Sequence, residues 1–282
     1  MIFWIASYPK SGNTWLRSLL SSYLYSKDGI FDQSLLSKIG QFPEKKYFNN
    51  FDYDPEIVTD TSKFWIKAQE KINKDKTLKF FKTHNILGAI NGNNFTNTQN
   101  TMGCIYIVRD PRNVITSLKN HYEMVNDEAL RFMLNEKKFI YDYNNKNDYS
   151  DFQFISSWEK NYTSWTNQKI FPIKFIKYEN LNEETFGVLK GIIEFINKIT
   201  NNKNTFDLKK AKNAIQSCSF EKLKNIEKTD GFSESVLSKN NPKKLPFFYL
   251  GPKNDWKNLF DKDYQKKLNL IFKKNLSELK YI

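Results

Sequence analysis

The chain has 282 residues, of which 39% are hydrophobic and 16% aromatic, so it can bury one large core and is not an intrinsically disordered segment. Its formal net charge of +13 is compatible with binding nucleic acid, an anionic membrane or a polyanionic small molecule, and does not choose among them. The two cysteines, Cys104 and Cys218, form no CxxC pair and lack the histidine spacing typical of zinc; this argues against a metal site and predicts a reducing compartment, the cytoplasm.

The first part of the chain is predicted to alternate strands and helices. An apolar strand over residues 2–7, too short to span a membrane, leads into a turn rich in Pro, Ser and Gly. Residues 28–60 show no clear period, 63–71 are predicted as helix, 78–82 as strand and 91–101 as a loop. The helix after the first turn has apolar side chains at helical spacing, namely Trp15, Leu16, Leu19, Leu20, Tyr23 and Leu24.

The rest of the chain continues this alternation. A strand over residues 103–108 is followed by Pro111, which suits the first turn of a helix that extends to residue 122. Further helices are predicted at 127–137, 151–167, 183–199, 207–216, 220–227 and 261–279, a strand at 172–177 and a long loop at 231–253. Buried strands alternating with helices predict one three-layer α/β/α domain over residues 1–282, with a central parallel sheet and ligand sites at the carboxyl ends of its strands.

The loop after the first strand is a candidate phosphate site. It lies between a strand and a helix N-terminus, where free backbone N–H groups and the helix dipole favour an anion, and Gly12 lets the backbone come close. It is not a Walker A loop, because the lysine precedes the glycine, so a required Mg²⁺ is not indicated. The candidate phosphate-binding residues are Lys10, Ser11, Gly12, Asn13 and Thr14, with Trp15 as an adjacent flat apolar surface.

Residues 8–15, YPKSGNTW, resemble the first motif of the PAPS-dependent sulfotransferase family, YPKSGTTW, with Asn13 as the departure. The donor of that family is 3′-phosphoadenosine 5′-phosphosulfate (PAPS), and its fold is P-loop-like. A second motif, residues 107–117, is similar to the family's 3′-phosphate segment and places Arg109 and Ser117 at the matching positions. Arg109 offers a planar fork to phosphate oxygens, and Ser117 follows two helical turns later. Arg112 is predicted to be a solvated helix charge.

The resemblance also implies the catalytic residues. It assigns His84, in the segment Phe81-Lys82-Thr83-His84, as the general base that deprotonates the acceptor hydroxyl or amine. An imidazole can accept a proton at neutral pH, and an unactivated alcohol needs such a base. Negative charge builds on the bridging oxygen as the sulfuryl group leaves, so Lys10, assisted by Lys82, is the candidate that stabilises it. The other histidine, His121, is interpreted as structural.

The same resemblance implies an adenine site and a C-terminal motif. The aromatic side chains at the adenine positions are Trp15, Phe220 and Tyr178, with Cys218 where the family commonly has a hydroxyl residue. Residues 248–258 look like the family's RKGxxGDWKN segment and keep Gly251 together with Asp255, Trp256, Lys257 and Asn258. Tyr249 and Leu250 replace the Arg-Lys pair that would bind the 3′-phosphate, and Asn254 replaces the later glycine, which leaves Lys253 or Tyr249 to compensate.

The predicted function is therefore transfer of a sulfuryl group from PAPS to a hydroxyl or amine acceptor. A P-loop-type small-molecule kinase is an enzymatic alternative, although the Walker order is missing. A basic nucleic-acid-binding protein would also explain the charge, although no such motif is visible. The acceptor, a small molecule or a carbohydrate, would be bound by residues 28–60, 91–101 and 231–245; a phenol, a lipid, a sugar and an anionic polymer all stay open, as does a homodimer.

Overall fold

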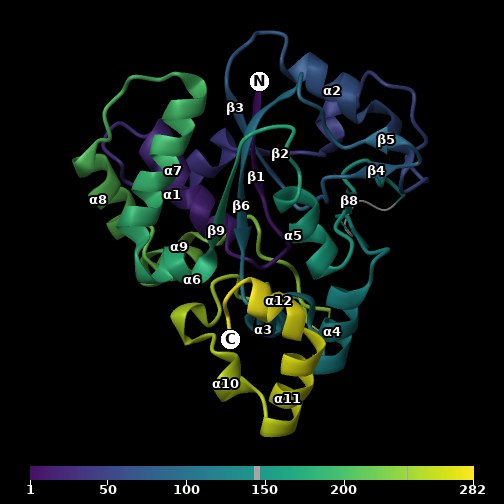
Figure 1. The fold of residues 1–282 in the computed structure, drawn as a ribbon, viewed down its shortest axis with the longest axis vertical. Coiled ribbons are helices and arrows are strands. Elements are labelled where there is room, and N and C mark those ends of the chain that lie inside the picture. The colour runs from purple at the N-terminus through teal and green to yellow at the C-terminus, as the bar shows by residue number, and fades with distance from the viewer. Residues whose placement is uncertain (143–146, 240) are drawn as a thin grey trace.

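The computed structural model describes residues 1–142, 147–239 and 241–282 (Figure 1). A five-stranded sheet in the order β2-β3-β1-β6-β9 forms its centre, and every neighbouring pair is parallel. Helices cover both faces of this sheet, as Figure 1 shows. The predicted three-layer α/β/α fold with a central parallel sheet is confirmed.

The sheet strands are β1 (Ile2–Ala6), β2 (Gly40–Gln41), β3 (Lys79–Thr83), β6 (Thr101–Val108) and β9 (Ile173–Lys177). Two small antiparallel pairs are formed by β4 (Ala89–Ile90) with β5 (Asn93–Asn94) and by β7 (Phe139–Ile140) with β8 (Gln153–Phe154). The α-helices are α1 (Asn13–Tyr25), α2 (Trp65–Ile72), α3 (Pro111–Tyr122), α4 (Asn126–Leu134), α5 (Trp158–Thr166), α6 (Tyr178–Glu183), α7 (Thr185–Thr200), α8 (Leu208–Ser217), α9 (Phe220–Asp230), α10 (Trp256–Leu259), α11 (Lys262–Ile271) and α12 (Lys273–Glu278). The 3₁₀ helices are η1 (Gln33–Lys38), η2 (Lys45–Tyr47), η3 (Asp60–Phe64) and η4 (Gly251–Lys253).

Strand β1 shows how the sequence divides the interior into two cores. All five of its residues are buried; Ile2, Trp4 and Ala6 join one hydrophobic cluster and Phe3 and Ile5 the other. Successive strand side chains point to opposite faces, so a continuous apolar run predicts a strand covered on both sides. Helices α1, α7, α8 and α9 contribute to one cluster, and α2, α3, α4, α5, α11 and α12 contribute to the other.

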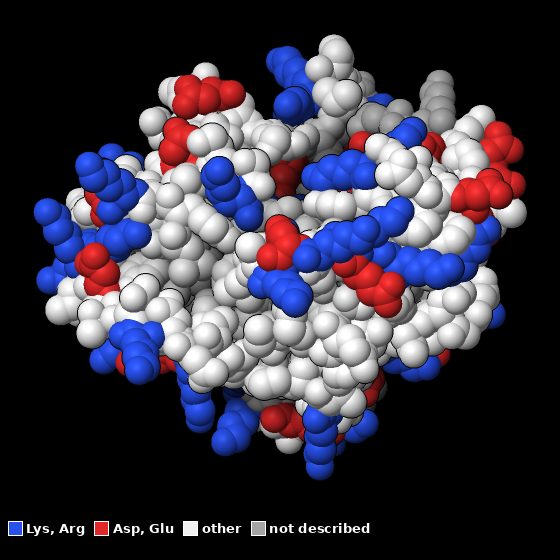
Figure 2. Space-filling view, turned by 90° about the horizontal axis from the view of Figure 1, so that it is seen from above, with Lys and Arg blue, Asp and Glu red and all other residues white. Residues whose placement is uncertain are grey.

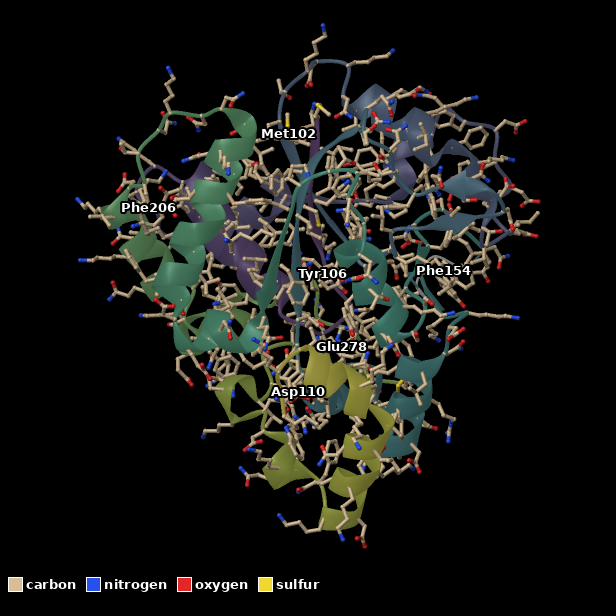
Figure 3. All side chains as sticks on the ribbon, in the orientation of Figure 1. Met102, Tyr106, Asp110, Phe154, Phe206 and Glu278 are labelled. Atoms are coloured by element: carbon tan, nitrogen blue, oxygen red, sulfur yellow. The ribbon has the colours of Figure 1, made fainter. Side chains whose placement is uncertain are left out.

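The sheet register brings the carboxyl ends of the strands together. Ala6 pairs with Thr83 and with Tyr106, and Val108 pairs with Lys177. Figure 3 shows Tyr106 within the sheet and Asp110 below it, toward the C-terminal helices. The turns that follow β1, β3, β6 and β9 therefore meet at one edge, and the predicted site residues Lys10, His84, Arg109 and Tyr178 lie at this edge.

Two predicted helices differ from the structure. Residues 151–167 are not one helix, because Gln153–Phe154 form a strand and α5 begins only at Trp158, where the Ser157 side chain accepts from the Lys160 N–H. The predicted helix 261–279 is divided at Phe272, whose side chain turns inward and meets the Trp158 ring edge-on at 5.7 Å. In both places tertiary contacts outweigh the local pattern.

Smaller differences concern segments without a clear period. Residues 28–60 contain η1, η2 and the edge strand β2, which pairs with β3 and was not predicted. The predicted loop 91–101 contains β5, and α4 ends at Leu134 rather than at residue 137. In the described part of the chain, no helix is both long enough and apolar enough to cross a bilayer.

Candidate active site

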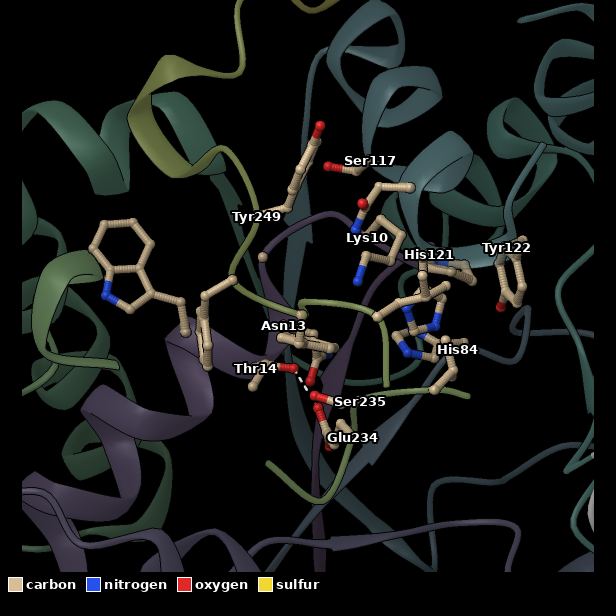
Figure 4. Close-up of a pocket in the computed structure, with 18 of the residues that line it drawn as sticks. Lys10, Asn13, Thr14, His84, Ser117, His121, Tyr122, Glu234, Ser235 and Tyr249 are labelled. Atoms are coloured by element: carbon tan, nitrogen blue, oxygen red, sulfur yellow. Dashed lines mark hydrogen bonds between the residues drawn. The ribbon is translucent and has the colours of Figure 1, made fainter. Parts of the chain in front are cut away.

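A cavity of about 1090 Å³ opens at the carboxyl edge of the sheet. Figure 4 shows side chains from the loop before α1, from α1 itself, from His84 after β3, from α3 and from the segment after α9 converging on it. Among the residues predicted to bind the donor or to act in catalysis, those that line this cavity are Lys10, Gly12, Asn13, Thr14, Trp15, Lys82, His84, Arg109, Ser117, Tyr178, Phe220 and Gly251. Ser11 and Lys253 are not among its lining residues.

The loop after β1 has the backbone geometry of an anion cradle. Gly12 is the N-cap of α1 and has φ 97°, so the first N–H groups of the helix face the loop. Ser11 is buried, and its Oγ has no hydrogen-bond partner among the described residues. A buried hydroxyl without a partner is costly unless a ligand supplies one, and a phosphate oxygen would fit this need.

We predict that Gly12→Ala weakens nucleotide binding by about tenfold or more, because a Cβ would collide with the Tyr178 ring and a left-handed backbone costs a non-glycine residue about 1–2 kcal/mol. Calorimetric titration with 3′-phosphoadenosine 5′-phosphate (PAP), together with thermal unfolding, would measure both effects. Gly92→Ala is the matched control, since Gly92 also has positive φ but nothing lies near its Cβ position. Equal PAP affinity in the two variants would contradict the prediction.

Lys10 enters the cavity from the same loop. Its Nζ lies 3.9 Å from the centroid of the Phe247 ring, and its backbone has φ 64°. Burial, opposed by Glu234 and reinforced by Arg109, lowers the pKa of Lys10 to about 7. The ammonium is therefore close to losing its proton at neutral pH in the ligand-free protein, and a bound anion would favour the charged form.

His84 is held in one orientation at the end of β3. Its Nδ1 lies 2.7 Å from the Ser7 carbonyl oxygen, which can only accept, so in the neutral ring Nδ1 carries the proton. Nε2 then keeps its lone pair. Burial, with a smaller contribution from Lys82, lowers the pKa of His84 to about 4, so the ring is neutral over the physiological range. This is the protonation state that a general base requires.

Asn13, the residue at which this sequence differs from the family motif, helps to hold His84 in its orientation. Its Nδ2 donates to the Ile5 carbonyl at 3.1 Å and to Ser7 Oγ at 3.2 Å, and Ser7 Oγ lies 3.2 Å from His84 Nδ1. The Asn13 side chain thus braces the end of β1 next to the histidine. Its contribution to an anion site would come from its backbone N–H at the helix start.

Arg109 lies at the end of β6 and combines several contacts. Its Nη1 donates to Ser117 Oγ at 3.2 Å and to the Lys10 carbonyl at 3.3 Å, and its guanidinium is 4.1 Å from the Tyr178 ring centroid. Its Nε is buried without a partner among the described residues. Asn254 also donates to Ser117 Oγ, at 3.2 Å. Arg109 and Ser117 are therefore adjacent, and the arginine retains a donor for a ligand.

Aromatic side chains surround the remaining part of the cavity. The Trp15 and Tyr178 rings meet edge-on with centroids 5.7 Å apart, and Trp15 Nε1 donates to the Cys218 carbonyl. Phe220 lies directly over Gly251, where any Cβ would meet its ring. Cys218 is buried, and its Sγ lies 3.6 Å from Ser22 Oγ. The structure thus brings the three predicted adenine-site aromatics to one end of the cavity.

Three sequence interpretations need correction or completion. Arg112 is not solvated: it is 3% exposed, pairs with both carboxylate oxygens of Asp110 and stacks on Trp256, because the C-terminal segment folds over α3. Tyr249, 49% exposed, lines the cavity, whereas Lys253 is exposed outside it, so of these two residues only Tyr249 can contact a ligand in the cavity. His121, interpreted as structural, also lines the cavity.

Sequence reasoning missed Glu234. Its carboxylate accepts from Thr14 Oγ1 at 2.5 Å (Figure 4). It also accepts from Lys82 Nζ at 2.6 Å and from Arg17 Nη1 at 2.7 Å. Glu234 belongs to a stretch without motif similarity, far along the chain from all three partners, so no pattern in the sequence connects it with the loop. Among the described residues, no group of three or more His, Cys, Asp or Glu side chains could hold a metal ion.

A model of the sulfotransferase domain matches residues 2–280. The chain belongs to the sulfotransferase family. Similar curated proteins include luciferin sulfotransferase of Photinus pyralis, 23% identical over 99% of this chain and 72% of that protein, and flavonol 3-sulfotransferase of Flaveria bidentis, 25% identical over 96% and 80%. In fold, this sulfotransferase is similar to mouse SULT7A1 complexed with PAP, with a TM-score of 0.57, 22% identity and coverage of 98% of this chain and 84% of that one.

Family membership decides among the three functions that the sequence left open. It favours the sulfotransferase over the P-loop-type kinase and over the nucleic-acid-binding protein. The surface agrees: the face shown in Figure 2 has lysines and arginines interspersed with acidic residues rather than gathered in one continuous patch. A nucleic-acid-binding surface is expected to concentrate its positive charge.

Proposed function

We propose that this sulfotransferase transfers the sulfuryl group of PAPS to a hydroxyl group of a small, largely apolar acceptor. The observation that supports this most directly is the convergence in one cavity of a neutral His84, oriented through Ser7, with Lys10 of the anion cradle and Lys82 of β3. Lys10 and the α1 N-terminus would hold the 5′-phosphosulfate. The site fits the nucleotide because Ser11 Oγ and Arg109 Nε are buried without partners among the described residues.

In the proposed reaction, His84 Nε2 removes the proton from the acceptor hydroxyl as its oxygen attacks sulfur. The bond between sulfur and the bridging oxygen breaks, and the electron pair stays on the 5′-phosphate of PAP. Lys10, and Lys82 beside it, stabilise the charge that develops on the leaving oxygen. The products are the sulfated acceptor, PAP and one proton, which His84 passes to solvent.

The cavity wall next to Lys10 favours a ring-bearing acceptor over a sugar polymer. The Phe247 and His121 ring centroids lie 6.0 Å apart, those of His121 and Tyr122 4.7 Å, and those of Tyr122 and Phe132 5.3 Å, so the rings form a continuous aromatic surface. All four residues line the cavity. Such a surface packs against a flat acceptor and offers few hydrogen bonds to sugar hydroxyls.

Radiolabelled PAPS would test the proposed reaction. We expect label transfer to phenols and flavonols, and little or none to oligosaccharides. ATP with the same acceptors serves as the comparison for kinase chemistry. Transfer of phosphate from ATP, or no transfer to any ring-bearing hydroxyl, would contradict the proposal.

Arg109 is proposed to hold the 3′-phosphate together with Ser117. We predict that the wild-type protein binds PAP more tightly than 5′-AMP, and that Arg109→Ala removes most of this difference, because a charge-assisted hydrogen bond to phosphate is worth about 1.5–3 kcal/mol. Calorimetric titration of both proteins with both nucleotides measures the interaction free energy between Arg109 and the 3′-phosphate. A preference that survives in the variant would place the 3′-phosphate elsewhere, with Tyr249 as the next candidate.

The pH dependence of PAP binding follows from Lys10. Since its pKa in the free protein is lowered to about 7, the ammonium is charged below this pH and loses its charge above it. A bound phosphate favours the charged form, so PAP affinity should fall as the pH rises through about 7 toward 9. Calorimetry in buffers of different ionisation enthalpy would detect proton uptake above pH 7. Lys10→Ala should remove this part of the pH dependence.

A further inference from the structure

Glu234 follows α9 and reaches back into the anion cradle. Its side chain is 20% exposed, and the three groups that donate to it come from α1 and β3. Of the residues that donate these hydrogen bonds, Thr14 is predicted to bind the nucleotide and Lys82 is predicted to assist Lys10 in catalysis. Figure 4 shows the Glu234 carboxylate directed at Thr14, below Lys10 in this view. An acidic side chain of the protein itself therefore accepts hydrogen bonds from groups that are predicted to act on the nucleotide.

The contact with Thr14 and a contact of the same hydroxyl with the nucleotide exclude each other. A threonine hydroxyl carries a single hydrogen, and this hydrogen is directed at Glu234 Oε2 at 2.5 Å. It cannot at the same time donate to a phosphate or sulfate oxygen. Lys82, with three N–H bonds, can keep Glu234 and still donate to a ligand. Donor binding through Thr14 thus requires this hydrogen bond to break.

The charges at the site lead to the same conclusion. Lys82 and Arg17 hold the pKa of the Glu234 carboxyl well below its usual range even though burial opposes this, so the group is ionised at neutral pH. Arg17 is 4% exposed and pairs with Glu234 Oε1. A fixed negative charge beside the cradle repels an anionic nucleotide and neutralises cations that would attract it.

The segment that carries Glu234 is also a wall of the acceptor space. Ser233, Ser235, Val236 and Leu237 line the cavity on either side of it. Ser235 Oγ and the backbone N–H groups of Phe247 and Phe248 all donate to Glu227 on α9, so the two edges of this segment are anchored at one residue. Glu234 therefore belongs to a cavity wall whose next residue, Ser235, is held to α9.

We propose that Glu234 is an internal counter-ion of the anion cradle. In the free enzyme it accepts the hydrogen bonds of Thr14 and Lys82, and the incoming nucleotide displaces it from Thr14. This inference rests on the proposed PAPS-dependent function and adds to it a competitor supplied by the chain itself.

The test is calorimetric titration of the Glu234→Gln variant with PAP. Glutamine keeps the shape of the side chain and removes the charge, so we expect about tenfold tighter PAP binding. The loss of affinity on adding salt should be larger than in the wild-type protein, because the site then attracts the anion more strongly and salt screens that attraction. Glu221→Gln is the matched control, because Glu221 is an exposed glutamate on neighbouring α9. This control should bind PAP as the wild-type protein does.

Glu234→Asp keeps the charge but withdraws it from Thr14, so this variant should bind PAP a fewfold more tightly than the wild-type protein. It replaces Glu234→Gln in the test if thermal unfolding shows that Glu234→Gln does not fold. Unchanged or weaker PAP binding in the folded variants overturns the inference and makes Glu234 part of the framework of the cradle. If neither the wild-type protein nor the variants bind PAP, the proposed function fails as well. If the variants bind PAP and the wild-type protein does not, the inference is supported.

Discussion

His84→Ala is expected to lower the rate of sulfuryl transfer about 100-fold or more, with PAP binding nearly unchanged. The imidazole is positioned by the Ser7 carbonyl and is neutral, so its removal takes away the proton acceptor. Within the described residues, its hydrogen bonds reach the loop that would hold the phosphosulfate by way of Ser7, whose Oγ accepts from the Asn13 amide. The nucleotide site should therefore survive the substitution.

Single-turnover assays with radiolabelled PAPS, paired with calorimetric titration by PAP, would separate the two effects of this change. His121→Ala is the informative comparison, because it removes the other histidine of the cavity from a different element, α3. We expect its rate to stay well above that of His84→Ala. Equal losses in the two variants, or full activity without His84, would exclude His84 as the base.

Lys10→Ala is expected to reduce the rate of transfer about 100- to 1000-fold, and PAP affinity by a smaller factor. The lysine can hold the phosphate in the ground state, but the charge on the bridging oxygen grows only as the bond to sulfur breaks. Its Nζ, placed over the Phe247 ring within the cavity, is shielded from bulk water. An ammonium in this setting acts more strongly on a developing charge than it would in solvent.

Kinetics and calorimetry on the same preparation would decide this point. Lys212→Ala, which removes an exposed lysine of α8, controls for the loss of one positive charge from a basic protein. Equal losses in rate and in PAP affinity would make Lys10 a binding residue only. Lys82 would then be the candidate for stabilising the leaving group.

Several parts of the molecule could be predicted from local sequence because local physics determines them. The run Ile2–Ala6 is apolar at every position and became a strand buried on both faces. The turn with Gly12 had to precede a helix, and Pro111 had to open one. Parallel strands then bring their following turns to one edge, so motifs near residues 10, 84, 109 and 178 could be placed together without a structure.

Other parts depend on contacts between residues that are distant in sequence. Whether Arg112 meets water or Asp110 and Trp256 is decided by where the C-terminal segment lies. The helix break at Phe272 reflects the Trp158 ring, not a local breaker. Side chains in such places follow the free energy of burying rings and pairing charges, which local propensity does not contain.

The sequence by itself determined the α/β architecture and the position of the phosphate loop after β1. It also determined that most of the motif residues line one cavity. Each of these follows from short-range patterns or from the rule that parallel strands share a carboxyl edge. The tertiary structure alone decided that Glu234 enters the cradle, that Asn13 braces β1, and that Tyr249 lines the cavity while Lys253 does not. The positions of Glu234 and Tyr249 depend on how the segment after α9 folds back over the sheet edge, and its path is set by ion pairs and ring contacts across the fold. The Asn13 hydrogen bonds depend on how the turn after β1 places the start of α1 against that strand.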